Sequence, residues 1–549
     1  MSCGAVSAMA MTPEHAVSAV PGWRLWAWAA VVLLVGLARL GSVPLFDVDE
    51  GAFSEATREL LASGDWGHTT LNGAPRWDKP ILTYWLQALS VRAFGLGEFG
   101  LRLPSVLAAW GWALAVALFA RPRWGEAAAL AAGTVVATSL GVLVIGRAAT
   151  ADALLNLWLA LTALDLWRHL EAERGSPAAR NALRRAGLWL GLGLLTKGPV
   201  AVLVPGAAAL LFIATEPRAV WRGRLVALLG DGRAWALMLV VTVPWYAYAL
   251  HRHGQAFIDG FFIRHNLARY GGTLEGHGGS VGYYLLVLPL LMLPWTPLLG
   301  LVLARVRGLW RVPLGRYLLG WAGFVLVFFS LSGTKLPHYA LYGLTPLALL
   351  AGQALTGPVP DGLRRVLTGL LAGLPLVLVG GTLLALRAAP GLGHPLYRAL
   401  LSAPVDTTGL LTAAGLATAW SALCLWARQG ARSVPARAGA AALGLALLVH
   451  AALAPWWGER LQAPVRHAAE AARQQPAPVV AVQWGLHLPS FAVYLQQEAP
   501  RRAPRPGELA LVRTDQLATL AAGGRWTTVH AERGLSLVRW QGPAVERTP

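Results

Sequence analysis

A long apolar segment runs straight into a cluster of acids in residues 23–51, WRLWAWAAVVLLVGLARLGSVPLFDVDEG. Its apolar part, 23–41, is long enough to cross a membrane as a helix. A second ionisable cluster, from Arg147 to Asp152, opens a later apolar segment. Charge beside hydrocarbon is costly, so polar residues at this depth are candidates for function. Two such clusters meeting at one water–lipid boundary would suit a substrate that is part lipid and part polar.

The composition is that of an integral membrane protein. The chain has 549 residues, a mean hydropathy of +0.51 and only 13% charged residues, whereas soluble proteins carry about 25% charged residues. Apolar runs of helical length recur along it, which excludes a membrane β-barrel with its short alternating segments. The net charge of +19 is explained by basic loops on the cytoplasmic side, so no nucleic-acid partner is expected.

The apolar runs predict an all-α polytopic membrane protein with about thirteen transmembrane helices. The candidate spans are 23–41, 104–121, 126–146, 150–168, 185–197, 199–215, 234–251, 281–304, 315–331, 339–355, 366–387, 408–427 and 438–456. Arginines gather in alternate loops, which places the N-terminus in the cytoplasm. The opposite side holds nearly every acidic or mixed-charge motif. We therefore expect a bacterial inner-membrane protein whose active site faces the periplasm.

The chain divides into a transmembrane catalytic domain, residues 1–456, and a small periplasmic α/β domain, residues 457–549. The first contains two large outer loops, 42–103 and 252–280. A helix over 51–63 has a register that suits lying along the membrane surface. In the second domain we predict strands at 479–484, 508–512, 527–530 and 535–540, with helices at 459–475 and 489–497.

The acidic cluster holds more carboxylates than helix capping requires. One of Asp47, Asp49 and Glu50 can cap the helix that begins near Gly51. The others are then available for catalysis or for orienting a substrate hydroxyl, with Asp49 the leading candidate. Asp152 has two interpretations. It either pairs with Arg147 at the interface, or it is a second carboxylate that faces the first across a cavity and binds a hydroxyl or a cation.

Lysines mark two further places. In the segment LTKGP, Gly-Pro breaks a helix at Lys197, which either extends its charge to the interface or binds phosphate as a point charge. Lys335 and Tyr339 lie at the mouth of a span, where they either anchor the span or contact a phosphate. Asp78 and His265 would form a two-ligand metal site, although His265 as a plain hydrogen-bonding residue explains its presence equally well.

These features belong to fragments that stand in a fixed order: DVDEGAFSEATRELLASGDW, LNGAPRWDKPILTYWL, FGLRLPSVLAA, RAATADALL, LLTKGP, FFIRHNLARY, GYYLLVLPLLMLPW and SLSGTKLPHYALYGLTP. The set resembles the bacterial lipid-A aminoarabinose transferases. It also resembles the wider protein-O-mannosyltransferase-like group of membrane glycosyltransferases with the GT-C fold. The resemblance covers residues 40–350, and the remainder matches only in outline.

The resemblance implies a sugar donor carried on a polyprenyl phosphate such as undecaprenyl phosphate. Asp49 and Asp152 take the places of the family's two acidic residues, and we group Glu50 with them as catalytic. The substrate-binding candidates are Arg58, Lys79, Lys197, Arg269, Lys335 and Tyr339. Asp78 stands where the aminoarabinose transferases usually have Glu, and this shorter side chain weakens the proposed metal pair with His265. The chain also departs from the commoner pattern at Asp47 and Gly51.

The expected activity is an inverting transfer of a sugar, for example 4-amino-4-deoxy-L-arabinose, to lipid A or another envelope acceptor. Lys and Arg can stabilise the leaving phosphate, so no cofactor is required and a divalent cation is optional. Three alternatives stay open. The chain is a mannose-like hexosyl transferase acting on a protein or glycan, a ligase that joins a lipid-linked glycan to another chain, or a flippase for a lipid-linked sugar, although it lacks the repeated halves of many transporters.

Overall fold

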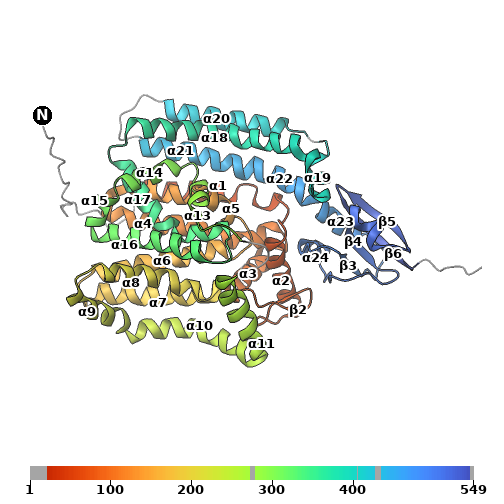
Figure 1. Cartoon of the computed structure of the whole chain (residues 1–549), viewed down its shortest axis with the longest axis horizontal. Coiled ribbons are helices and arrows are strands. Elements are labelled where there is room, and N and C mark those ends of the chain that lie inside the picture. The colour runs from red at the N-terminus through yellow and green to blue at the C-terminus, as the bar shows by residue number, and fades with distance from the viewer. Residues whose placement is uncertain (1–21, 273–277, 405, 427–433, 544–549) are drawn as a thin grey trace, which may run out of the picture.

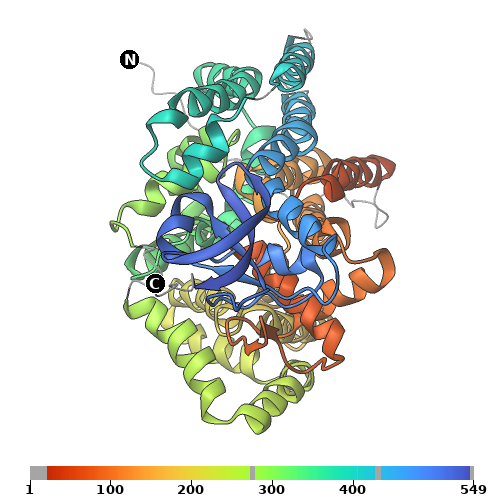
Figure 2. The ribbon, with the colours of Figure 1, turned by 90° about the vertical axis from the view of Figure 1, so that its right-hand side faces the viewer.

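The computed structural model describes residues 22–272, 278–404, 406–426 and 434–543. It is a bundle of helices that run side by side, with a small β-sheet at one end next to α2 and α23 (Figure 1). Figure 2, which looks onto this end, shows the C-terminal strands in front of the bundle. The chain is therefore mostly helical, as its apolar runs predict.

The main helices follow the predicted spans. They are α1 (Trp23–Leu37), α4 (Glu98–Thr138), α5 (Leu140–Ile145), α6 (Asp152–Glu171), α7 (Pro177–Lys197), α8 (Val200–Ala214), α10 (Gly232–His253), α13 (Tyr283–Leu291), α14 (Thr296–Ala304), α16 (Pro313–Leu331), α17 (Leu344–Thr356), α18 (Asp361–Ala388), α20 (Thr408–Trp426) and α21 (Val434–Leu448). Shorter helices join them: α9 (Arg218–Leu229), α15 (Val306–Arg311), α19 (Pro395–Ser402) and α22 (Ala454–Leu461).

Fewer helices have the length and composition of a membrane span than the sequence predicts. Among the described residues, seven are long and apolar enough, or eight if the bent pair α13 and α14 counts as one span. The predicted span 104–121 and the first part of 126–146 lie in one element, α4, whose two parts are separated by Gly125 with a φ of 81°. The rest of the second span continues through Ser139 into α5. α8 has only 15 residues, and α6 and α7 carry several charged side chains. The protein is a multi-pass membrane protein.

Tryptophans buried between the helices find polar partners, as an indole N–H in an apolar core requires. Trp112 of α4 donates to the Thr345 hydroxyl of α17 at 2.7 Å, and Trp295 donates to Thr138 of α4 at 2.9 Å. Trp321 of α16 donates to the carbonyl oxygen of Tyr342 at 2.9 Å. These bonds tie α4, α16 and α17 into one core, and this core supports the site.

The first outer loop forms a compact layer at the end of the bundle. It contains α2 (Asp49–Ser63), the two-residue strands β1 (Thr70–Leu71) and β2 (Ala74–Pro75), and α3 (Leu82–Phe94). The β1–β2 turn has Asn72 and Gly73 at φ values of 53° and 76°, which suits these residues. α2 differs from the expected surface helix. It is buried from Glu50 to Leu60, between α3 and the C-terminal helix α24.

The second outer loop is helical in its described part up to Gly271. It contains α11 (Gln255–Phe257), a π-helix over Ile258–Ala268 and α12 (Arg269–Gly271). Phe257 and Phe261 are buried in an aromatic cluster with Trp245 and Tyr246 of α10. Phe261 also packs against the break between α7 and α8, where a Cβ on Gly198 would lie 2.6 Å from its ring. This apolar packing holds the loop against the bundle.

The C-terminal part is a four-stranded sheet with helices on both faces. Its elements are α23 (Ala463–Arg473), β3 (Ala481–Trp484), α24 (Ser490–Leu495), β4 (Leu509–Arg513), α25 (Thr514–Leu520), β5 (Gly524–Glu532) and β6 (Leu535–Pro543). The strand order is β3-β4-β6-β5, with β3 parallel to β4 and the other pairs antiparallel. All four predicted strands are present, and the short helix α25 is an addition to the prediction.

Candidate active site

Two cavities of similar size meet where α6 begins and α7 ends. The lysine cavity has a volume of about 480 Å³ and combines charged residues with apolar walls; its lining includes Asp78, Lys79, Lys197, Val200, Leu203, His265, Phe328, Tyr339 and Tyr342. The aspartate cavity has a volume of about 440 Å³ and is lined by residues that include Asp47, Asp49, Arg147, Asp152 and His338.

A buried ion pair separates the two cavities. Asp152, the first residue of α6, and Lys197, the last residue of α7, have their Oδ1 and Nζ atoms 2.5 Å apart. Each charge lies at the helix end that stabilises it, since the helix dipole favours anions at the N-terminus and cations at the C-terminus. The expected alternative pair with Arg147 does not form, because Arg147 donates instead to the Ala38 carbonyl. Asp152 is therefore a partner of Lys197 rather than a free carboxylate.

The Gly-Pro break explains the position of Lys197. Helix α7 stops at Lys197 because Gly198 has a φ of 76°, and Pro199 then precedes α8. The Lys197 Nζ lies 5.5 Å from the ring centre of Tyr339 and 5.8 Å from that of Tyr342. These aromatic faces favour a nearby cation. The break thus presents a buried ammonium group to the lysine cavity, as the sequence predicts.

Asp49 is the exposed carboxylate of the aspartate cavity. It is the first residue of α2, and it makes no hydrogen bond or ion pair within 4 Å to another residue that the structure describes. The nearby His338 lies 3.5 Å from Asp152 Oδ1 through its Nε2 atom. A carboxylate without a protein partner at the wall of a cavity can accept a proton or orient a hydroxyl of an incoming substrate.

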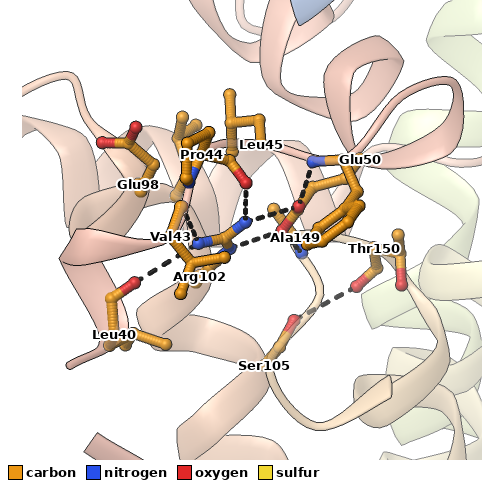
Figure 3. A network of polar contacts seen from close by, with 12 residues as sticks. Leu40, Val43, Pro44, Leu45, Glu50, Glu98, Arg102, Ser105, Ala149 and Thr150 are labelled. Carbon is orange, nitrogen blue, oxygen red and sulfur yellow. Dashed lines mark hydrogen bonds and ion pairs between the residues drawn. The ribbon is translucent and has the colours of Figure 1, made fainter. Parts of the chain in front are cut away.

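Glu50, the neighbour of Asp49, is bound on both carboxylate oxygens, and its predicted catalytic role stays a prediction. Arg102 of α4 donates to both of its oxygens, at 2.6 and 2.7 Å (Figure 3). The backbone N–H groups of Phe46 and Ala149 also donate to the two oxygens, each at 2.8 Å. Because these donors occupy both oxygens of a buried carboxylate, Glu50 joins the outer loop to the bundle, and together with Arg102 it forms part of the wall of the aspartate cavity.

Asp78 and His265 contact each other directly in the lysine cavity. His265 Nε2 lies 2.9 Å from Asp78 Oδ1, and Arg76 lies 3.1 Å from the other Asp78 oxygen. Burial tends to raise the pKa of Asp78, but the hydrogen bond from His265 and the charge of Arg76 hold that pKa well below its usual range. Arg76 places a guanidinium on this carboxylate, and the described ranges contain no group of three or more potential metal ligands. Both observations argue against a divalent-metal site.

The structure separates the remaining predicted residues. Lys79 lines the lysine cavity and donates to the Asp78 carbonyl at 3.0 Å. Arg58 is paired with Glu55 at 2.6 Å on buried helix α2 and lines neither cavity, and its predicted substrate contact stays a prediction. Lys335 also lines neither cavity and donates to the Ser332 carbonyl at 2.6 Å. Arg269 begins α12, and its side chain lies outside the described part of the structure.

Comparison with known proteins places the chain in a family. A family model described as dolichyl-phosphate-mannose-protein mannosyltransferase matches residues 78–248. An undecaprenyl phosphate-alpha-4-amino-4-deoxy-L-arabinose arabinosyl transferase from Edwardsiella ictaluri is 32% identical over 69% of this chain and 68% of its own length. The chain belongs to this arabinosyl transferase family. A member from Pseudomonas paraeruginosa is 33% identical, and the match spans 66% of this chain and 65% of that protein. This chain spans slightly less than two thirds of the length of several such relatives.

A solved structure supports the fold over nearly the whole chain. ArnT from Cupriavidus metallidurans, crystallised with undecaprenyl phosphate, has a TM-score of 0.78 and 24% identity, and the match covers 94% of this chain and 98% of that one. An oligosaccharyltransferase from Archaeoglobus fulgidus is more distant, with a TM-score of 0.50 and 11% identity. The expected GT-C fold is confirmed by the first likeness.

Arg102, His338 and Tyr342 line the two cavities of this protein but were not predicted as site residues, although each carries a signal in the sequence. Arg102 lies inside an apolar helix, where a charge needs a buried partner. His338 and Tyr342 flank Tyr339 in the fragment KLPHYALY. Lysine usage is a further signal. The chain has only three lysines among its 46 Lys and Arg residues. Two of them line the lysine cavity, and the third bonds to Ser332, which also lines it.

Proposed function

We propose that the protein is an inverting glycosyltransferase. It moves 4-amino-4-deoxy-L-arabinose from undecaprenyl phosphate to lipid A on the periplasmic face of the bacterial inner membrane. The observation that carries this proposal is the separation of charge across one ion pair. A cavity with lysines and apolar walls lies on one side of Asp152 and Lys197, and a cavity with the free carboxylate of Asp49 lies on the other. The names of the family members supply the sugar and the carrier.

The lysine cavity suits the donor. Its apolar walls, which include Val200, Leu203 and Phe328, match an isoprenoid chain, and its ammonium groups on Lys79 and Lys197 match a phosphate. Tyr339 adds a hydroxyl on the same wall. When the bond from the sugar to the phosphate breaks, negative charge grows on the leaving oxygen. Fixed cations in a dry cavity stabilise that charge strongly. The co-crystallisation of the Cupriavidus protein with undecaprenyl phosphate supports this donor.

The aspartate cavity suits the acceptor. An oxygen of the acceptor attacks the anomeric carbon of the sugar, and the carbon–oxygen bond to the polyprenyl phosphate breaks as the new bond forms. Asp49 takes the proton of a hydroxyl acceptor or orients an acceptor oxygen that is already ionised. Because acceptor and leaving group occupy cavities on opposite sides of the ion pair, a single displacement inverts the anomeric centre. Asp152 holds Lys197 in place and does not itself act as the base.

The placement in the membrane is part of the same proposal. The first outer loop and the C-terminal sheet lie at one end of the bundle, and residues of this loop line both cavities. We assign this end to the periplasm by the distribution of arginines. The short or charged helices α6, α7 and α8 would then cross the membrane with the longer ones, toward the predicted thirteen crossings. Residues 1–456 would form the catalytic domain and residues 457–549 a periplasmic domain. The surrounding membrane lipid would supply the donor by lateral diffusion.

The test is a transfer assay with the full-length protein in detergent. Radiolabelled undecaprenyl-phosphate aminoarabinose and lipid A are the substrates, and Asp49→Asn is compared with the unaltered protein. We expect Asp49→Asn to lower kcat by about 100- to 10,000-fold, because it removes a general base while keeping the side-chain shape. Donor binding should persist, since Asp49 does not line the lysine cavity.

Asp361→Asn is the matched control, because Asp361 pairs with Arg364 at the surface, outside both cavities. It should transfer sugar like the unaltered protein. Equal activity of Asp49→Asn and Asp361→Asn would contradict the role of Asp49. No transfer by the unaltered protein would reject this donor–acceptor pair. A polyprenyl-phosphate mannose with a protein acceptor would be tested next, as the mannosyltransferase family match suggests.

A further inference from the structure

The segment that carries Asp49 is held by the C-terminal domain. Both carboxylate oxygens of Asp47 accept hydrogen bonds from Ser490, the first residue of α24, one from its backbone N–H at 2.9 Å and one from its hydroxyl. At the other end of α24, the Tyr494 hydroxyl accepts from the backbone N–H of Leu45 at 2.7 Å and donates to Glu98 at 3.0 Å. Residues 45–47 are thus fixed at two points by one short helix.

Gly51 makes this contact possible. A Cβ at this position would lie 2.1 Å from Asp47 Oδ1 and 2.6 Å from the backbone nitrogen of Ser490. Neither distance is compatible with a side chain at position 51. A larger residue there would therefore break the hydrogen bond from Ser490 to Asp47. Glycine inside a helix costs about 1 kcal/mol relative to alanine. Its presence in the first turn of buried α2 is explained by this close approach.

Asp49 lies between two anchored carboxylates. Asp47, two residues before it, is bound to Ser490 of the C-terminal domain, and Glu50, the next residue, is bound to Arg102 of α4. Asp49 itself faces the aspartate cavity and has no protein partner among the described residues. The anchor on each side fixes the backbone at the start of α2, and that backbone sets where the Asp49 carboxylate points. The first anchor exists only when the C-terminal domain is docked.

We propose that Asp47, Gly51 and Ser490, assisted by Tyr494, form a lock through which the C-terminal domain positions Asp49 for the reaction. This inference rests on the proposed function. It makes Ser490 and Tyr494 positioning residues that act across more than 400 positions of sequence, although neither lines a cavity.

The test compares Ser490→Ala, Ser490→Thr and Gly51→Ala in the full-length protein. We expect Ser490→Ala and Gly51→Ala each to lower kcat by about 10- to 100-fold while the KM for the lipid donor stays unchanged, because a displaced reacting group lowers the rate without altering a remote binding site. Ser490→Thr keeps the hydroxyl and should recover most of the rate. The double variant of Gly51→Ala and Ser490→Ala should be no slower than the slower single variant, since both break one contact.

Ser536→Ala is the matched control. Ser536 is also a buried serine of the C-terminal domain, but its hydroxyl bonds to Thr514 at 2.8 Å, away from residues 45–51. The lock would be overturned if Ser536→Ala lowered kcat as much as Ser490→Ala does. It would also be overturned if Ser490→Ala raised the KM for the donor and left kcat unchanged.

Hydrogen exchange of residues 45–52 gives a second readout that does not depend on activity. Ser490→Ala should speed exchange there, and Ser536→Ala should not. Equal exchange in the two variants would overturn the lock even if transfer is observed. Absence of transfer by the unaltered protein, together with faster exchange in Ser490→Ala, would reject the proposed substrates and leave the contact between the domains established.

Discussion

The two cavities differ in charge more than in size. The lysine cavity and the aspartate cavity have volumes of about 480 and 440 Å³. The first presents the ammonium groups of Lys79 and Lys197, beside Asp78, among aromatic and aliphatic walls. The second presents several carboxylates beside Arg147 and His338. Asp152 of the second cavity pairs with Lys197 of the first. This separation teaches how one site can keep an ammonium group and an unpaired carboxylate close together without their neutralising each other. A third carboxylate, Asp152, neutralises the lysine and leaves Asp49 free.

Breaking the pair between the cavities should have the largest effect. Lys197→Met leaves Asp152 buried without its lysine, so we expect a loss of about 3–5 kcal/mol in the free energy of unfolding. The same change removes a cation from the leaving phosphate, so transfer should fall by about 100- to 1,000-fold. Thermal melting in detergent and the transfer assay measure the two effects separately.

The double variant of Asp152→Asn with Lys197→Met sharpens this prediction. It removes the unpaired charge, so stability should largely return, whereas transfer should remain low because the phosphate still lacks its cation. Recovery of transfer in the double variant would contradict the assignment of Lys197 to the phosphate. Full transfer by Lys197→Met alone would contradict it as well.

Lys79 should affect binding of the donor and not of the acceptor, because it lines the lysine cavity and not the aspartate cavity. Lys79→Gln removes one charged hydrogen-bond donor to the phosphate, so the KM for the donor should rise about 10-fold while the KM for the acceptor is unchanged. Lys335→Gln is the matched comparison, because Lys335 lines neither cavity, and its donor KM should change far less.

Chemical modification of the lysines tests independently whether the donor contacts Lys79 and Lys197 but not Lys335. With only three lysines in the chain, reductive methylation followed by mass spectrometry reports each one separately. Undecaprenyl phosphate should protect Lys79 and Lys197 more than Lys335. Equal protection of all three lysines, or none at Lys79, would contradict the placement of the donor in the lysine cavity.

The smallest expected effect is a pH dependence at the edge of the aspartate cavity. Burial raises the pKa of Asp47 from 3.8 to about 7, although the hydrogen bonds from Ser490 oppose this, and the neighbouring charge of Glu50 adds to it. The docked state therefore holds a proton that the undocked segment releases. Docking should be fully stable below pH 3.8, weaken as the pH rises toward about 7, and then stay constant.

Hydrogen exchange of residues 45–52, corrected for the intrinsic rate at each pH, measures this effect. Exchange in the unaltered protein should quicken between acidic and neutral pH, and Asp47→Asn should flatten the curve because it cannot ionise. An identical pH dependence in both proteins would show that another group is responsible. We rank this effect last because the side chain of Asp47 keeps some contact with solvent, which offsets part of the burial that raises its pKa.

Local features of the sequence were sufficient to predict much of the fold. The helix break at Gly198-Pro199 and the four C-terminal strands appear where they were predicted. Each depends on a few neighbouring residues whose backbone preferences are strong. The helical second loop was harder to predict, since its aromatic side chains are ordered by packing against α10 rather than by a local pattern.

The candidate site was only partly predictable, because an ionisable residue has no role until its partner is known. Asp49 and Glu50 are neighbours in sequence and had the same prediction, yet one is free in a cavity and the other is bound by Arg102, 52 positions away. Arg58 shows the same limit, because the sequence does not reveal that it pairs with Glu55 on the buried helix α2 and lines neither cavity.

The sequence by itself determined that this is a helical membrane protein with polar residues at the ends of its helices. Apolar run length and the cost of burying charge are properties of the chain that hold in any arrangement. Only the tertiary structure decided which charges neutralise each other. Electrostatic pairing depends on the distance between side chains, and packing alone placed Asp152 beside Lys197, Glu50 beside Arg102 and Asp47 beside Ser490.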